Sequence, residues 1–216
     1  MPLNDVYPSY PLAERIADGI VHTLGIVGSI VGVTLLLALG WPRLTGGEIA
    51  GITIYSVAIL LAFTASALYH MTPWERLRPL FRRIDHATIF LKIAGTYTPL
   101  VVLIGSAFSY VVLAVVWLLA LGGAVRKLIF WRNPKTGHSL IYLALGWLSL
   151  LLIWSVFQTL PLAAGILMIC GGLVYSAGVL IYSRPSMRFS QAIWHSFVLA
   201  GSGCFFAAIA VGTTYA

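Results

Sequence analysis

The stretch SALYHMTPWERLRPLFRRIDHATIFLKIAGTYTP, at residues 66–99, joins two long apolar segments through a short basic loop. One segment ends at His70, and the next begins with Asp85 and His86. Ser66 and His70 are four residues apart, so on a helix they lie on one face, about one turn apart. The spacing therefore predicts that a hydroxyl, an imidazole and a carboxylate gather near the ends of these two segments.

The composition indicates an integral membrane protein. Of 216 residues, 60% are hydrophobic and only 9% are charged, whereas soluble domains average about 25% charged residues. The formal net charge is +7. Because the basic residues fall in loops between apolar segments, we expect them to contact membrane lipids, not nucleic acid, and they imply no soluble protein partner.

Seven apolar segments are long enough to cross a bilayer, which takes about 20 residues each. They are unbroken and lack the alternation of outer-membrane barrels. We therefore predict an all-α, seven-transmembrane helix bundle that forms a single domain over 1–216, with an irregular arm at 1–13 and no signal peptide. The predicted spans are roughly 15–40, 47–70, 84–104, 110–126, 138–157, 161–183 and 191–213.

The basic residues also predict an orientation. One side of the bundle carries eleven of them in short loops or at their borders, and the other side carries Arg43 alone. By the positive-inside rule the N-terminus is cytoplasmic and the C-terminus is outside. The eleven are Arg15, Arg76, Arg78, Arg82, Arg83, Arg126, Lys127, Arg132, Lys135, Arg184 and Arg188.

This orientation places every histidine in the cytoplasmic half of the bundle. The group shares that half with several other polar side chains, and Glu14, Asp18 and His22 stack on one face of the first span because they are four residues apart. The histidines are His22, His70, His86, His138 and His195, and the other polar residues include Ser66, Asp85 and Gln191.

A divalent metal held by His70 and His195 is one interpretation of this pattern. Zinc suits imidazole ligands, and a catalytic site leaves one position for water. Asp85 would then deprotonate that water, and Ser66 would hold it by a hydrogen bond. The alternative is that histidines at a membrane boundary only cap helix ends or reach towards water. Separately, we expect Lys92 to form a structural ion pair with a carboxylate in the bundle.

Several motifs resemble the hemolysin III family, the bacterial members of the progestin and adipoQ receptor superfamily. They cover nearly the whole chain, in the order in which that family has them. The motifs are ERIADGIVHTLG at 14–25, S-x-x-x-H at 66–70, IDHATIFLKIAGTYTPL at 84–100 and AIWHSFVLAGS at 192–202.

The resemblance implies a seven-helix bundle with a cytoplasmic N-terminus in the bacterial plasma membrane. It also implies a zinc site of three histidines, to which His70 and His195 correspond, with Ser66 and Asp85 close to a bound water. The chain departs from the family at Gln191, where many members have the first histidine of an H-x-x-x-H motif. An amide oxygen is a poorer zinc ligand than an imidazole, so we expect Gln191 or His22 to complete the site.

Two further departures lie deeper in the last span. A histidine that often follows His195 by ten residues is replaced by Phe205. Its neighbour Cys204 lies about 13 Å deeper than His195, because a helix rises 1.5 Å per residue. Cys204 therefore cannot replace the missing ligand.

Two functions are consistent with these residues and with the resemblance. One is a zinc-dependent hydrolase that cleaves lipid amides or esters; the resemblance implies that it is ceramidase-like and contributes to membrane-lipid homeostasis. The other is a non-enzymatic membrane protein: a sensor, a receptor-like bundle or a haemolytic protein that perturbs membranes. The sequence leaves the substrate and the oligomeric state open.

Overall fold

A computed structural model describes residues 10–130, 138–184 and 186–214 of the chain. Within these residues it contains seven helical segments long and apolar enough to cross a membrane, and no strand. The predicted all-α, seven-span fold is confirmed. The helices are α1 (Leu12–Gly40), α2 (Gly46–Met71), α3 (Arg78–Ile104), α4 (Ala107–Ile129), α5 (His138–Trp147), a 3-10 helix (Leu148–Leu152), α6 (Ile153–Thr159), α7 (Leu162–Tyr182) and α8 (Ser190–Thr214).

Local sequence explains three of the helix ends that face the predicted outer side. Thr45 precedes α2 in a capping box: its hydroxyl accepts the Glu48 N–H, and the Glu48 carboxylate accepts the Thr45 N–H at 2.7 Å. Gly105 ends α3 at a φ of 68°, a left-handed conformation that glycine adopts without strain. Ser106 then caps α4 by accepting the Ser109 N–H. This tight turn makes α3 and α4 antiparallel neighbours.

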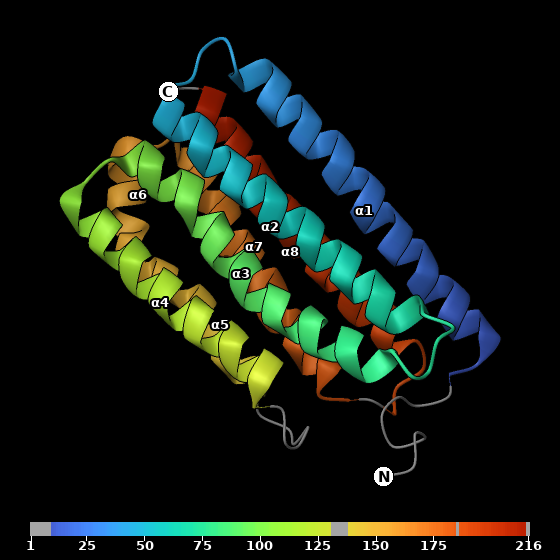
Figure 1. Cartoon of the computed structure of the whole chain (residues 1–216). Coiled ribbons are helices and arrows are strands. Elements are labelled where there is room, and N and C mark those ends of the chain that lie inside the picture. The colour runs from blue at the N-terminus through green and yellow to red at the C-terminus, as the bar shows by residue number, and fades with distance from the viewer. Residues whose placement is uncertain (1–9, 131–137, 185, 215–216) are drawn as a thin grey trace.

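The helices lie side by side in one bundle, with α3 the most deeply buried span (Figure 1). Helix α3 packs between α2 and α4, while α1 packs against α2 and α8, and α7 pairs with α8. The first turn of α1 and the last turn of α8 lie at opposite ends of the bundle (Figure 1). As a result, four helix ends meet at the end of the bundle that is rich in basic residues. They are the first turns of α1, α3 and α8 and the last turn of α2.

The fifth span differs from its prediction, because it is not one continuous α-helix. A 3-10 segment at Leu148–Leu152 separates α5 from α6. Just before this break, the Tyr97 hydroxyl of α3 hydrogen-bonds to the carbonyl oxygens of Leu145 and Gly146, at 3.0 and 2.7 Å. Competition for backbone acceptors at this point explains the change in helical winding.

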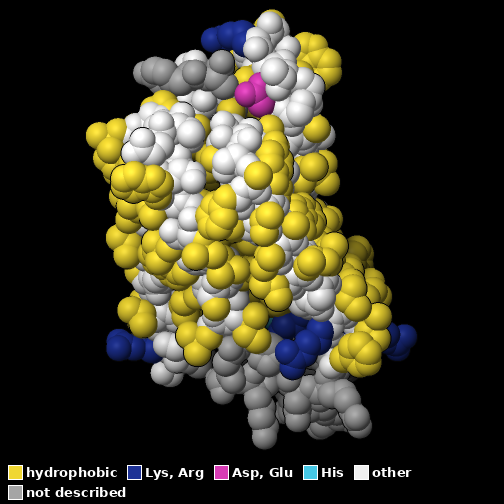
Figure 2. Space-filling model, turned by 90° about the vertical axis from the view of Figure 1, so that its left-hand side faces the viewer, with side chains coloured by type: hydrophobic (Ala, Val, Ile, Leu, Met, Phe, Trp, Pro, Cys, Tyr) yellow, Lys and Arg dark blue, Asp and Glu magenta, His cyan; other side chains and the backbone are white. Residues whose placement is uncertain are grey.

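The surface follows the pattern expected of a membrane protein. Hydrophobic side chains cover the middle of the face in Figure 2, and Lys and Arg side chains lie mainly at one end. This distribution agrees with the predicted cytoplasmic N-terminus, which stays a prediction because no membrane is present. Most of the predicted arm at 1–13, Arg132, Lys135 and the side chain of His138 lie outside the described residues.

Candidate metal centre

Four buried side chains from three helices meet at the end of the bundle that is rich in basic residues. Asp18, His22, His70 and His195 are each at most 7% exposed. Each offers one ligand atom, and these atoms lie within 4.8 Å of one another. We call these four residues the histidine cluster.

The sequence of α1 explains why two members of the histidine cluster point inwards. The buried residues of this helix, which include Asp18, His22, Gly25 and Ser29, are spaced by three or four and form one narrow stripe. A side chain at Gly25 would bring its Cβ to 2.9 Å from the Phe63 ring of α2. Glycine at this position therefore lets α1 approach α2 closely, which carries Asp18 and His22 towards His70.

The Asp18 carboxylate lies at the middle of the histidine cluster. Its Oδ1 is 2.6 Å from the Nδ1 of His195, a hydrogen-bond distance. Its Oδ2 is 3.6 Å from the Nε2 of His22 and 3.8 Å from the Nδ1 of His70. The three imidazole rings also contact one another, with centroids 4.4 Å apart for His22 and His195, and 4.5 Å apart for His70 and His195.

Two atoms of the histidine cluster have unused bonding capacity. Among the described residues, Asp18 Oδ2 and His22 Nε2 are buried and have no hydrogen-bond partner. Leaving such atoms unpaired costs about 1–3 kcal/mol each. Ligand atoms about 2.0–2.2 Å from a tetrahedral zinc would be roughly 3.3–3.6 Å apart, close to the separations found here. The donor set therefore fits a divalent cation.

The loop between α2 and α3 fixes the position of His70. Arg78, which is buried, donates hydrogen bonds to the carbonyl oxygens of Tyr69 and Thr72 at 3.3 and 2.8 Å, where α2 ends. It also donates to both carboxylate oxygens of the exposed Glu75, at 3.0 and 2.7 Å. These hydrogen bonds hold the pKa of Glu75 below its usual value. From the sequence, Arg78 was interpreted only as one of the basic residues that predict the orientation of the protein in the membrane.

The predicted catalytic residues lie beside the histidine cluster. Asp85 is buried on α3, 3.4 Å from the Nδ1 of His86, and it interacts electrostatically with His70 and His195. Ser66 is half-buried, one turn before His70 on α2, and its hydroxyl makes no hydrogen bond within the described part of the chain. The structure therefore places Asp85 next to the cluster, and the roles of both residues stay predictions.

Gln191 lines a small cleft together with Asp18. Its amide donates a hydrogen bond to the Tyr10 hydroxyl at 3.2 Å. The cleft has a volume of about 10 Å³, about the space that one water needs. It is lined by Tyr10, Glu14, Arg15, Asp18, Phe189, Gln191 and Ala192. Asp18 is thus one wall of this cleft although it is only 3% exposed.

His70 and His195 could be brought together from the sequence, but Asp18 was not recognised as a member of the cluster. The signal was present, because Asp18 lies four residues before His22 on the stacked face of α1. Periodicity shows that the two share a face, but it does not show the direction in which that face points. The rotation of α1 about its axis is set by its contacts with α2 and α8.

Comparisons with known proteins identify close relatives over nearly the whole chain. The family model described as "Haemolysin-III related" matches residues 12–206. The hemolysin-3 homolog of Bacillus subtilis (strain 168) is 34% identical over 200 residues, covering 91% of this chain and 93% of its own. Hemolysin-3 of Bacillus cereus is 34% identical over 194 residues, 89% of each chain. The human monocyte to macrophage differentiation factor is 29% identical over 207 residues, 91% of this chain and 83% of its own.

Proposed function

The chain belongs to the haemolysin-III related family, and on that premise we propose that it is a zinc-dependent membrane hydrolase that cleaves amide or ester bonds of lipids. The observation that carries this proposal is the histidine cluster: three imidazoles around one carboxylate, in which Asp18 Oδ2 and His22 Nε2 face each other at 3.6 Å without a hydrogen bond to any described residue. Such a donor set is the usual environment of a divalent transition metal.

In this proposal His22, His70 and His195 hold the metal and Asp18 orients them. The short contact with Asp18 fixes the Nδ1 proton of His195 and leaves its Nε2 free to bind, as in other carboxylate–histidine–metal arrangements. Gln191 keeps its hydrogen bond to Tyr10 in the cleft. In this proposal His22 therefore takes the place of the histidine ligand that this chain lacks at position 191.

The remaining polar residues beside the cluster supply proton transfer and positioning. A bound zinc ion would supply activation of water and polarisation of the lipid carbonyl. Asp85, buried beside His70 and His195, accepts the proton of the attacking water. The Ser66 hydroxyl, one helical turn from His70, orients that water. The leaving amine or alcohol takes up a proton from the same carboxyl group.

The substrate class follows from the surroundings of the site. The outer faces of the spans are apolar, with large exposed side chains such as Leu24, Val57 and Leu118, so a substrate that enters between helices must itself be a lipid. The basic end of the bundle would attract anionic headgroups. We place the protein in the bacterial plasma membrane with its N-terminus in the cytoplasm.

Metal content tests the first part of the proposal. Elemental analysis of the purified full chain should find close to one zinc per chain, and His70→Ala should remove most of it. His86→Ala is the matched control, because His86 lies outside the histidine cluster, and it should keep the metal. Zinc at background level in the unmutated protein would refute the proposal.

Lipid turnover tests the second part. The zinc-loaded protein in lipid nanodiscs should release fatty acid from ceramide or from an ester lipid, and His70→Ala should lose that activity. Absence of release across a broad panel of amide and ester lipids, with zinc bound, would leave the metal site standing and reject the hydrolase.

A non-enzymatic metal protein is the second candidate, favoured by one specific observation. Four protein donors lie within 4.8 Å, and four protein ligands are typical of closed, structural zinc sites. X-ray absorption spectroscopy separates the two candidates. Three nitrogen ligands with a solvent oxygen support the hydrolase, whereas direct ligation by Asp18 and all three imidazoles supports a stabilised sensor or receptor-like bundle.

A further inference from the structure

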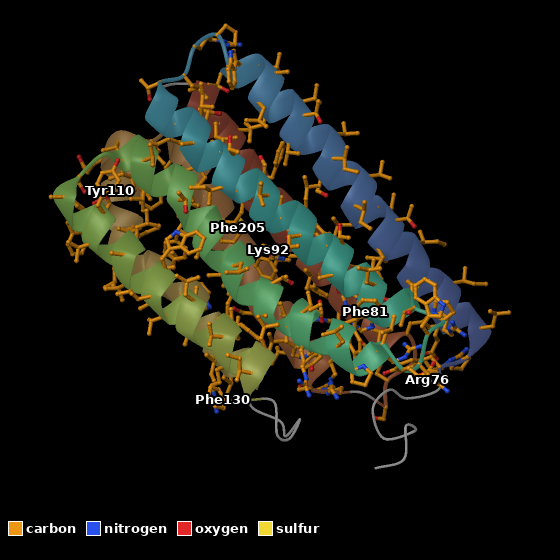
Figure 3. All side chains as sticks on the ribbon, in the orientation of Figure 1. Arg76, Phe81, Lys92, Tyr110, Phe130 and Phe205 are labelled. Atoms are coloured by element: carbon orange, nitrogen blue, oxygen red, sulfur yellow. The ribbon has the colours of Figure 1, made fainter. Side chains whose placement is uncertain are left out.

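Asp85, the proton acceptor of the proposed reaction, lies against the imidazole of the next residue, His86. Both residues belong to α3, between Phe81 and Lys92, which are labelled in Figure 3. The Oδ2 of Asp85 is 3.4 Å from the Nδ1 of His86. Adjacent residues of an α-helix point about 100° apart and normally do not face each other. This contact therefore requires that one of the two side chains is turned towards the other.

The lysine of the same helix is not a partner of Asp85. Lys92 follows Asp85 by seven residues, about two turns or 10 Å along α3. Its Nζ donates hydrogen bonds to the Tyr175 hydroxyl of α7 at 3.0 Å and the Ser202 hydroxyl of α8 at 3.2 Å. We call Lys92, Tyr175 and Ser202 the Lys92 node. The ion pair predicted for Lys92 is not formed, because no carboxylate of the described residues lies within 4 Å of Nζ.

Two contacts fix the position of His86, one through its ring and one through its backbone. The ring Nδ1 is 2.9 Å from the carbonyl oxygen of Arg82, one turn earlier on α3. The hydroxyl of Tyr142, on α5, donates to the backbone carbonyl of His86 at 3.0 Å. Because the ring is held in this way, it is the Asp85 side chain that is turned towards His86.

The atoms around Nδ1 decide which nitrogen of His86 carries the hydrogen. The carbonyl oxygen of Arg82 and an ionised Asp85 carboxylate can only accept hydrogen bonds. Nδ1 must therefore be an N–H donor that is shared between these two oxygens. A separation of 3.4 Å is long for such a bond, but hydrogen bonds of catalytic groups are often long before the substrate binds and shorten in the complex.

The second oxygen of Asp85 remains for the reaction. Oδ1 accepts no hydrogen bond from the described residues. The carboxylate also interacts electrostatically with His70 and His195, two members of the histidine cluster. With Oδ2 held by His86, the carboxylate can present Oδ1 to a water beside the cluster.

We propose that His86 is the positioning residue of the hydrolytic step: its Nδ1–H holds Oδ2 of Asp85, so that Oδ1 faces the attacking water. This role rests on the proposed hydrolase function. An O–H bond of the water breaks as its oxygen bonds to the lipid carbonyl carbon, and the proton goes to Oδ1. The leaving amine or alcohol takes that proton when its own bond to the carbonyl carbon breaks. His86 therefore keeps its Nδ1 hydrogen throughout and acts only through Asp85.

Steady-state kinetics of the full chain in lipid nanodiscs tests this role, with ceramide or the ester lipid that the unmutated protein cleaves. His86→Leu should lower kcat by about ten- to a hundredfold and leave KM and the zinc content unchanged. His86→Asn is the matched variant, because it has nearly the shape of leucine but places an amide nitrogen where Nδ1 stood, and it should recover most of kcat. In an Asp85→Asn background, His86→Leu should cause no further loss, because the two residues act as one unit.

Nuclear magnetic resonance gives a readout that does not depend on turnover. In the full chain labelled with nitrogen-15 in its histidine rings, comparison with His86→Asn identifies the signals of His86. These signals should show a hydrogen on Nδ1. A ring whose only hydrogen is on Nε2 could not donate to Asp85 through Nδ1 and would overturn the proposal.

The kinetic results can overturn the role of His86 separately from the hydrolase. Equal kcat in His86→Leu and the unmutated protein would do so, and so would equal losses in His86→Leu and His86→Asn. Both results would leave the hydrolase standing, because they concern only the orientation of Asp85. Absence of turnover in the unmutated, zinc-loaded protein would instead reject the hydrolase, and the role of His86 with it.

Discussion

The histidine cluster and the Lys92 node are both buried polar layers, two helical turns apart, but they bring together different groups. The histidine cluster has a carboxylate oxygen and an imidazole nitrogen without partners among the described residues, which suits a cation. In the Lys92 node, formed by Lys92, Tyr175 and Ser202, a buried lysine is surrounded by hydroxyls. The comparison shows that the two layers differ in kind: one places a carboxylate among imidazoles, and the other places an amine among hydroxyls.

The largest expected effect concerns the chemistry at the histidine cluster. Asp85→Asn should lower lipid turnover by about a hundredfold or more, because the proton acceptor is lost, while the zinc content stays the same. Turnover in nanodiscs and elemental analysis of the same preparation measure both quantities. Glu48→Gln, in the capping box at the opposite end of the bundle, is the control and should keep full turnover. Undiminished turnover in Asp85→Asn would remove this residue from the mechanism.

The second-largest effect is expected on zinc affinity when the Asp18 carboxylate is removed. Asp18→Asn should weaken zinc binding by about ten- to a hundredfold, because it removes the charge that orients His195 and faces His22. Competition with a zinc-binding dye measures the affinity. Glu14→Gln, one turn earlier on α1 at the cleft, should change it much less. Equal zinc affinity in Asp18→Asn would show that this carboxylate is not part of the site.

A smaller effect is expected at the wall of the Lys92 node. A Cβ at Gly95 would lie 2.6 Å from the Cβ of Ala58, so Gly95→Ala should force α2 and α3 apart and cost about 1–3 kcal/mol. Gly28 has nothing within 4 Å, and Gly28→Ala should be neutral or stabilising by up to about 1 kcal/mol. Thermal unfolding in detergent should therefore give a lower Tm for Gly95→Ala only. Equal Tm values would mean that the two helices are packed less closely than described.

The smallest effect is expected from neutralising the node itself. In delipidated protein, Lys92→Met should leave the Tm unchanged or raise it slightly, because removing a buried charge that has no opposite charge relieves a desolvation cost. The same thermal scans measure it. A lower Tm that corresponds to a loss of about 3–5 kcal/mol in the free energy of unfolding is what breaking a buried salt bridge costs. That result would instead show that Lys92 pairs with a carboxylate within the protein.

Much of the fold was predictable, because an apolar segment long enough to cross a bilayer can be recognised from consecutive residues alone. The predicted span 47–70 corresponds to Gly46–Met71, and 191–213 to Ser190–Thr214. The interruption at Leu148–Leu152 was not predictable in this way. It depends on a hydroxyl from Tyr97, which is distant in sequence and comes close only after the bundle has packed.

The candidate site was predictable in part. Motif spacing brought His70 and His195 into one layer, and the structure places their rings 4.5 Å apart. The sequence had also offered His22 as an alternative to Gln191. The inward rotation of α1, which brings Asp18 into the cluster beside His22, depends on packing at Gly25. The ion pair expected for Lys92 was wrong for a geometric reason: Asp85 lies two turns away along the same helix, in the other layer.

An anomalous-difference map at the zinc absorption edge, from crystals of the full chain, tests the central claim most directly. The account predicts one strong peak within bonding distance of His22, His70 and His195, beside Asp18. A well-ordered map with no peak among these residues, or with the only peak elsewhere in the bundle, would contradict it.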